Sequence, residues 1–163
     1  MEAGKCRSGV CVCQSLKDDH KTILREADVF YEALNKLRYE GRAQRAANRR
    51  AVGKSLSVLK KHLLDHITVE EKKIFPLLVS FLPRLEAVMY LLYSEHEEFR
   101  ENLRSLEKSI GGLPWALQSQ GMYLVCLLRS HFQIETQGVY AAVHDELRPD
   151  EKRRLSKNVA AFG

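Results

Sequence analysis

The stretch HITVEEKKIF, His66 to Phe75, decides how this chain is interpreted. It lies in a segment whose core-facing residues recur at steps of three and four, the period of an amphipathic helix: Leu56, Leu59, Leu63, His66, Glu70, Ile74, Leu77 and Phe81. Pro83 marks the end of that helix. A histidine and a glutamate one turn apart thus occupy positions where apolar side chains are expected, and burying them without a partner is costly.

Three further segments have the same period. The first, from about residue 16 to 39, has the core-facing residues Leu16, His20, Ile23, Ala27, Phe30, Leu34 and Leu37. Another has Leu85, Val88 or Met89, Leu92, His96, Phe99, Leu103, Leu106 and Ile110, and is closed by Gly111 and Gly112. The last follows Pro114 and has Leu117, Leu124, Leu128, His131, Glu135, Gly138 and Ala142.

Four long amphipathic helices, the last three joined by short connections, predict an all-α fold, an up-down-up-down four-helix bundle. We expect the bundle to span residues 15–147. A flexible tail with three cysteines precedes it at residues 1–14, and residues 148–163 can add a short fifth helix. Ser15 and Asp18 resemble a capping box at the start of the first helix.

Length and composition point to one soluble, mostly helical domain. The 163 residues are enough to bury a core without disulfides or metals, so stability alone does not require a metal. The first residues lack the apolar core expected of a signal peptide, and no stretch approaches the roughly 18 apolar residues of a membrane span. The four cysteines do not form a spaced disulfide framework. These features predict a cytoplasmic protein with reduced thiols.

The net charge of +5 is concentrated in one segment. From Lys36 to Lys61 there are nine Lys or Arg residues and a single acidic residue, Glu40. The segment has no aromatic interleaving and no nucleic-acid motif, so the sequence argues against a nucleic-acid partner. We interpret it as a solvated connection between the first two helices, and a protein partner with an acidic surface stays open.

Six ionisable residues occupy the core-facing stripes of the four helices: His20, His66, Glu70, His96, His131 and Glu135. Pointing into one core, they would need a compensating cation. Mixed imidazole and carboxylate donors favour iron, manganese or zinc over calcium or magnesium. A dinuclear centre bridged by Glu70 and Glu135 fits four histidines and two carboxylates better than a single ion does, since a carboxylate can span two metals.

An internal repeat supports this interpretation. LLDHITVEEKKIFPLL, from Leu63, aligns with LRSHFQIETQGVYAAV, from Leu128, at an offset of 65 residues. His and Glu match in both copies, and Phe75 pairs with Tyr140. The second and fourth helices are thus two versions of one metal-compatible element.

At these residues the chain resembles the hemerythrin family, the HHE cation-binding domains. That family's pattern is a His on the first helix, His-x-x-x-Glu on the second, His on the third and His-x-x-x-Glu on the fourth, and residues 16–144 follow it. Ferritin-like bundles instead use Glu-x-x-His. The resemblance implies a non-haem centre of two iron ions, with Glu70 and Glu135 as bridging carboxylates and His20, His66, His96 and His131 as terminal ligands.

The chain departs from the oxygen-carrying members at one position. They have a second histidine four residues after the first on the third helix, where this chain has Arg100, which cannot ligate iron because it stays protonated. One iron would then have an open position, which disfavours reversible oxygen carriage and favours reaction with O2, peroxide or nitric oxide. Glu71 or Glu97 could substitute as ligands, although we expect both to face water.

Other polar residues near the pattern are expected to play lesser roles. His62 lies one turn before His66 but on the flank of its helix, and His144 lies beyond the metal level. Three tyrosines, Tyr31, Tyr93 and Tyr140, could gate the site or donate hydrogen bonds. Cys6, Cys11 and Cys13 form either a redox-responsive tail or a tail with incidental thiols, and Cys126 lies off the core-facing stripe.

Three functions remain open from the sequence. The first is a hemerythrin-like di-iron protein that binds or reduces a small oxidant (O2, peroxide or NO), as a sensor or as a protective factor in oxidative stress. The second is an iron- or redox-sensing binding module without turnover, which signals through a contact with a protein partner. The third is a metal-free interaction bundle. Whether the protein is an enzyme is left undecided.

Overall fold

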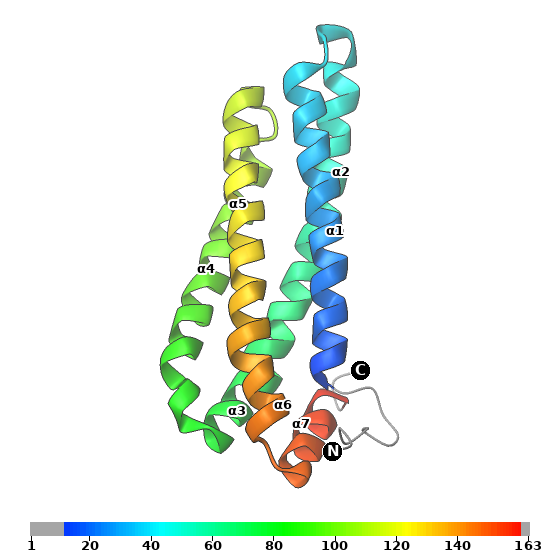
Figure 1. Cartoon of the computed structure of the whole chain (residues 1–163). Coiled ribbons are helices and arrows are strands. Elements are labelled where there is room, and N and C mark those ends of the chain that lie inside the picture. The colour runs from blue at the N-terminus through cyan, green and yellow to red at the C-terminus, as the bar shows by residue number, and fades with distance from the viewer. Residues whose placement is uncertain (1–11, 161–163) are drawn as a thin grey trace.

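The computed structural model describes residues 12–160, and all of its regular elements there are helical (Figure 1). This confirms the all-α fold class, with no strand among these residues. In chain order the elements are α1 (Val12–Tyr39), η1 (Arg42–Gln44), α2 (Arg45–Val69), η2 (Glu70–Ile74), α3 (Phe75–Phe81), η3 (Pro83–Leu85), α4 (Glu86–Ser109), α5 (Pro114–Ile134), η4 (Glu135–Tyr140), α6 (Ala141–Glu146) and α7 (Pro149–Ala160).

The long helices lie side by side in a bundle (Figure 1). α1 packs mainly against α2 and α5, and α4 packs against α5 and α2. The turns η2 and η4 continue α2 into α3 and α5 into α6, so that each pair forms one long helical segment. The short α7 packs at one end of the bundle against η2, α1 and α3 (Figure 1). None of the described helices has the length and apolar content to cross a membrane.

The first helix is longer than its periodicity predicted. α1 includes Val12 and Cys13, which are buried together with Leu16, so these residues extend the packed face by one turn. Ser15 lies inside the helix and does not cap it. Helix therefore begins before the expected boundary at residue 15, while Cys6 and Cys11 lie outside the described residues.

The expectation of a solvated basic connection is wrong for most of its length. Only residues 40–44 connect α1 to α2, which begins at Arg45. Alanine and arginine have high helix propensity, and Val52 is fully buried on the same face as Leu56. Arg49 donates hydrogen bonds to the carbonyl oxygens of Ile110 and Gly112, which ties this end of α2 to the connection between α4 and α5.

The core consists of two apolar clusters. One contains Ile23, Phe30, Leu63 and Phe99 among others, and the other contains Leu16, Phe75, Leu92 and Tyr140 among others. Along each long helix the chain passes from one cluster to the other through one or two of the buried histidines and glutamates. The polar residues therefore form a layer between two apolar cores, shielded from water on both sides.

Both His-x-x-x-Glu motifs end in a π turn. The amide of Phe75 donates to the carbonyl of Glu70, five residues earlier, and η4 begins at Glu135 in the same way. One extra residue per turn shifts the helix register, so Phe75 and Leu78 are buried where the constant period predicted Leu77 and Phe81. For the same reason Gly138, predicted to face the core, is exposed.

Candidate metal centre

The six ionisable residues predicted from the core-facing stripes come together in one buried layer. His20 comes from α1, His66 and Glu70 from α2 and η2, His96 from α4, and His131 and Glu135 from α5 and η4. All six are buried, and Glu70, His96, His131 and Glu135 have no exposed surface. The layer places four imidazoles and two carboxylates in the low-dielectric interior of the bundle.

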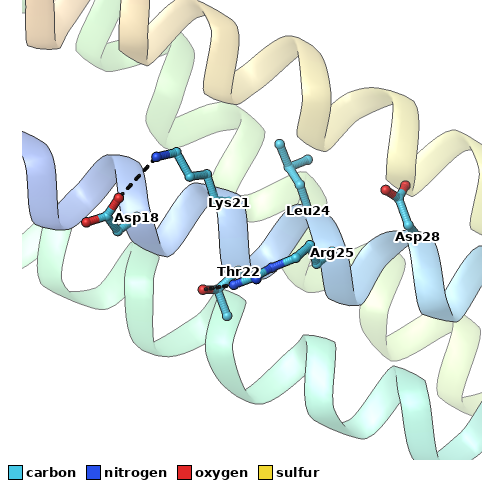
Figure 2. A pocket seen from close by; sticks show the side chains of 6 residues that line it. All are labelled: Asp18, Lys21, Thr22, Leu24, Arg25 and Asp28. Carbon is cyan, nitrogen blue, oxygen red and sulfur yellow. Dashed lines mark hydrogen bonds and ion pairs between the residues drawn. The ribbon is translucent and has the colours of Figure 1, made fainter.

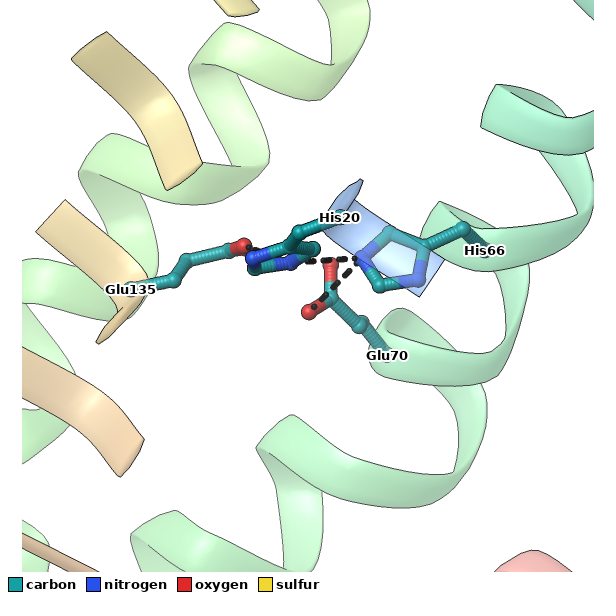
Figure 3. A group of neighbouring side chains, drawn as sticks. All are labelled: His20, His66, Glu70 and Glu135. Carbon is teal, nitrogen blue, oxygen red and sulfur yellow. Dashed lines mark hydrogen bonds and ion pairs between the residues drawn. The ribbon is translucent and has the colours of Figure 1, made fainter. Parts of the chain in front are cut away.

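These side chains form two groups that share both carboxylates. His20 and His66 form one group with Glu70 and Glu135 (Figure 3), and His96 and His131 form the other with the same two glutamates. Within each group the potential ligand atoms lie within 4.8 Å of one another. Two metal positions that share two carboxylates are therefore available from the side chains alone.

Each carboxylate turns one oxygen to each histidine pair. Glu70 places Oε1 3.4 Å from His66 Nε2 and Oε2 3.4 Å from His96 Nε2. Glu135 places Oε2 3.0 Å from His20 Nε2 and Oε1 2.9 Å from His131 Nε2. This is the arrangement that a carboxylate needs to bridge two ions.

The histidine nitrogens face one another in a way that calls for a cation or a proton between them. The two Nε2 atoms of His20 and His66 lie 3.0 Å apart, and those of His96 and His131 lie 3.1 Å apart. Two ligands of one ion that are about 2.1 Å from it and at right angles lie about 3 Å apart. Without an ion, a shared proton is needed to offset the repulsion between two lone pairs.

The protonation of the metal-free layer follows from this crowding. Burial by itself lowers the pKa of His66, but the carboxylates of Glu70, Asp19 and Glu135 together outweigh burial and raise this pKa to about 10. At His96 burial again lowers the pKa, and the carboxylates of Glu135 and Glu70 outweigh it and raise this pKa to about 9. Burial raises the pKa of Glu135, but the surrounding histidines outweigh burial and hold this pKa well below its ordinary value. The layer thus stores protons that a bound cation would displace.

Three histidines give their outer nitrogen to a carboxylate of another helix. His96 Nδ1 donates to Glu71 Oε1 at 2.9 Å, and His131 Nδ1 donates to Glu95 Oε2 at 2.6 Å. His66 Nδ1 lies 3.4 Å from Asp19 Oδ2. Such contacts fix the tautomer with Nε2 available as a ligand, and they orient the ring.

These supporting carboxylates were missed or misjudged from the sequence, although a signal is present. Asp19 precedes His20, Glu71 follows Glu70 and Glu95 precedes His96, so each is a direct neighbour of a candidate ligand. A residue next to a core-facing position points across to the adjacent helix rather than into the centre. Three of the six candidate ligands, His20, Glu70 and His96, therefore have a neighbour in the sequence that supports the histidine of another helix.

His20 is held differently. Its ring stacks on Phe132 with centroids 3.8 Å apart and planes 11° apart. Its Nδ1 is buried without a hydrogen-bond partner among the described residues. An aromatic face thus replaces the carboxylate that supports the other three histidines.

Arg100 pairs with a carboxylate at the edge of the layer. Its guanidinium donates to Glu71 Oε1 at 3.1 Å and to Oε2 at 2.8 Å, and it also contacts Glu97. The expectation that Glu71 faces water is therefore wrong, because Glu71 accepts from both His96 and Arg100. Glu97 is two-thirds exposed, as expected of a residue on the flank.

The remaining candidates lie around the layer or away from it. His62 is half-buried and pairs with Glu26 at 2.5 Å, outside both metal-capable groups. His144 is exposed, and Cys126 is exposed and off the stripe as predicted. Tyr31 contacts Met122 Sδ. Tyr140 is the one of the three tyrosines that touches the layer itself, through Glu70 and His20.

Three carboxylate oxygens of the layer lack a hydrogen bond of good geometry: Glu70 Oε2 and both oxygens of Glu135. Histidine nitrogens lie within 3.5 Å of each of them, so the atoms are close but do not point at one another as donor and acceptor. Donors that converge on common points rather than pairing are suited to cations placed between them. The residues present therefore fit a pair of metal ions.

Two surface hollows flank α1. One is lined by Asp18, Lys21, Thr22, Leu24, Arg25 and Asp28 (Figure 2). Lys21 pairs with Asp18 and Arg25 with Thr22 within α1, and Asp28 pairs with Arg129 of α5. This hollow contains none of the six layer residues. The other, of about 320 Å³, lies between α1 and α2 and reaches the layer at His66, with Asp19, His62 and Asp65 on its walls. Only this second hollow leads towards the metal-capable groups.

Comparison with curated proteins finds no match. Comparison with protein families matches residues 13–143 to the Hemerythrin HHE cation binding domain. The match covers most of the chain and includes all six residues of the buried layer. The chain therefore belongs to the hemerythrin family, as a helical HHE cation-binding domain with a buried His/Glu cluster that can hold metal ions.

Proposed function

We propose that this chain is a non-haem di-iron protein that binds or reduces a small oxidant, O2, peroxide or nitric oxide, as a sensor or protective factor in the cytoplasm. The observation that carries the proposal is the position of Glu70 and Glu135, each with one oxygen towards either histidine pair. The proposal keeps the up-down-up-down order of four helices that the sequence predicts.

His20 and His66 would hold one ion, His96 and His131 the other, and both glutamates would bridge them. When bound, two iron ions supply two electrons and coordination positions to an incoming oxidant. Asp19, Glu71 and Glu95 keep three imidazoles in the tautomer that presents Nε2. The two apolar cores on either side of the layer shield it from water.

The pairing of Arg100 supports oxidant chemistry over reversible oxygen carriage. The family's oxygen carriers have a histidine at this position, whereas here the guanidinium is held by Glu71 and adds no donor to the layer. The His96 and His131 position is thus left with two imidazoles and two carboxylates. The hollow that reaches His66 between α1 and α2 supports entry of a small molecule from that side.

A second candidate is a sensing module without turnover. It is favoured by α7, which packs on η2, and by Asn158 Nδ2, which donates to the carbonyl of Lys73 inside that π turn. A change in metal occupancy at Glu70 would alter η2 and, through this contact, the packing of α7 at the end of the bundle. Loss of helicity or of α7 protection on iron removal would favour sensing, while a folded but inactive metal-free protein would favour an enzyme.

The first experiment is metal analysis of protein purified without chelators and, separately, loaded with ferrous iron under anaerobic conditions. Two irons per chain, with consumption of added peroxide, O2 or NO followed by absorption spectroscopy, is the expected result. A chain that keeps no stoichiometric metal after loading contradicts the proposal. It would leave a helical interaction bundle.

A further inference from the structure

The π turn η4 brings a tyrosine onto the face of the helix that holds Glu135. In a regular α-helix a residue five positions later points about 140° away from the first. In a π turn the residues at positions i and i+5 are linked by the backbone hydrogen bond and lie above one another. Tyr140 therefore points to the buried layer, where it is 1% exposed.

The phenol oxygen of Tyr140 lies among atoms assigned above to one metal position. It is 2.6 Å from Glu70 Oε1, to which it donates, and 3.2 Å from His20 Nε2. These intervals match the 3.0 Å between the Nε2 atoms of His20 and His66. They also match the spacing of about 3 Å expected between neighbouring ligands of one ion.

The repeated half of the bundle has no such oxygen. Phe75 is the counterpart of Tyr140, five residues after Glu70 at the end of η2, and its ring stacks on His96 as the ring of Tyr140 lies against His20. In all other respects the two positions have the same protein donors, two histidines and the two shared carboxylates. One hydroxyl group thus makes the two halves of the site chemically different.

We propose that the phenol oxygen of Tyr140 is a further protein ligand of the metal ion held by His20 and His66. This inference rests on the di-iron function proposed above. Binding replaces the O–H bond by an oxygen–metal bond, and the proton leaves the layer with those displaced from the histidines. The nearby buried carboxylates repel a negatively charged phenolate, whereas a bound cation stabilises it.

The metal-free layer shows why an ion is needed for that step. Burial, with the carboxylates of Glu70 and Glu135 nearby, holds the pKa of Tyr140 well above its ordinary value, so the phenol keeps its proton and donates to Glu70. With the metal bound, the position of His20 and His66 has five protein donors and that of His96 and His131 has four.

The test compares wild-type protein with Tyr140→Phe and Tyr93→Phe, each loaded with ferrous iron and oxidised to the ferric state. A tyrosinate bound to iron(III) gives a visible charge-transfer band with phenolate vibrations in resonance Raman spectra. We expect the band in the wild type and its loss in Tyr140→Phe, with two irons per chain and unchanged helicity. Tyr93→Phe is the matched control, since its hydroxyl lies 3.5 Å from the Glu71 carbonyl and away from the ligand atoms.

The outcomes separate this inference from the function on which it rests. Wild-type protein that holds two ferric irons but lacks the band contradicts the assignment of Tyr140 and leaves the di-iron proposal intact. A band that survives in Tyr140→Phe also overturns it. A wild-type chain without iron removes both proposals. If Tyr140→Phe does not fold by circular dichroism, the wild-type Raman spectrum decides by itself, because only a coordinated phenolate gives the enhanced vibrations.

Discussion

Three of the buried histidines are oriented by carboxylates that contribute no atom to the metal-capable groups. Of these carboxylates, Glu71 accepts the most hydrogen bonds, one from His96 Nδ1 and one from each of two nitrogens of Arg100. Arg100 and His96 lower the pKa of Glu71 against the desolvation that raises it, so it stays ionised as an acceptor. The arginine at the position of the oxygen carriers' histidine thus acts on the layer only through Glu71.

Replacing Glu71 by alanine should weaken metal binding without removing a ligand. Without its acceptor His96 can rotate or change tautomer, and loss of such a partner typically lowers metal affinity about 10- to 100-fold. Chelator competition measures the effect. Glu97→Ala is the matched control, since Glu97 also contacts Arg100 but not His96. Equal affinity in the two variants would show that Glu71 does not position His96.

The shared carboxylate is the residue on which a paired centre depends. Glu70→Ala should abolish the pair, leaving fewer than two irons per chain, because both histidine groups lose a donor. His62→Ala should leave metal content almost unchanged, since His62 pairs with Glu26 outside both groups. Metal analysis with circular dichroism distinguishes lost binding from lost folding. Iron loss in His62→Ala would mean that the ligand assignment on α2 is wrong.

At the scale of elements, the two π turns set the geometry beyond the ligands. Each begins at a glutamate of the layer and ends by turning an aromatic residue, Phe75 or Tyr140, towards a histidine of another helix. In η2 the backbone carbonyl of Lys73 accepts a hydrogen bond from the side chain of Asn158 of α7 at 2.7 Å. α7 thus contacts the turn that holds Glu70 and Glu71.

Asn158→Ala should lower the free energy of unfolding by about 1 kcal/mol, the usual contribution of one protein hydrogen bond. The change removes the donor to Lys73 and leaves Leu155 to anchor α7 in the core. Urea unfolding followed by circular dichroism measures it. Lys157→Ala, at an exposed position of α7, is the control and should change stability little. Two identical unfolding curves would indicate that the contact does not support η2.

At the scale of the whole molecule, the buried layer couples stability to pH. The pKa values of about 10 for His66 and about 9 for His96 in the folded chain exceed the ordinary histidine value of 6.5. The folded state therefore binds protons more tightly than the unfolded state. This contribution to stability is fully present below about pH 6.5 and is lost as the pH rises through 9 to 10.

We therefore expect the melting temperature of the metal-free protein to fall between pH 6.5 and pH 10. Metal affinity should rise over the same interval, since ions and protons compete for the same nitrogens. Differential scanning calorimetry of metal-free and iron-loaded samples tests both statements, and the loaded sample should depend less on pH. A melting temperature of the metal-free chain that is flat or rises across this interval would contradict the stored-proton account.

Local pattern was enough to predict the helices and the members of the layer. A period of 3.6 residues depends only on residues close together in the sequence. It identified the buried stripes of α1 and α4, including His20 and His96. The cost of burying ionisable side chains then distinguished the six residues from ordinary core positions. The types of the six residues predicted a dinuclear centre bridged by the two glutamates, and the family resemblance favoured iron among the metals that such donors bind.

Contacts between helices decided the rest. The start of α2 at Arg45 depends on packing against α1 and on the carbonyls that Arg49 reaches, not on the charge of the segment. The π turns break the constant period, so Gly138 is exposed although the period places it in the core, and Tyr140 is buried. By itself the sequence determined which residues face the core, because helical periodicity is local. Only the tertiary structure decided how Glu71 and Tyr140 meet the layer, because their partners lie on other helices.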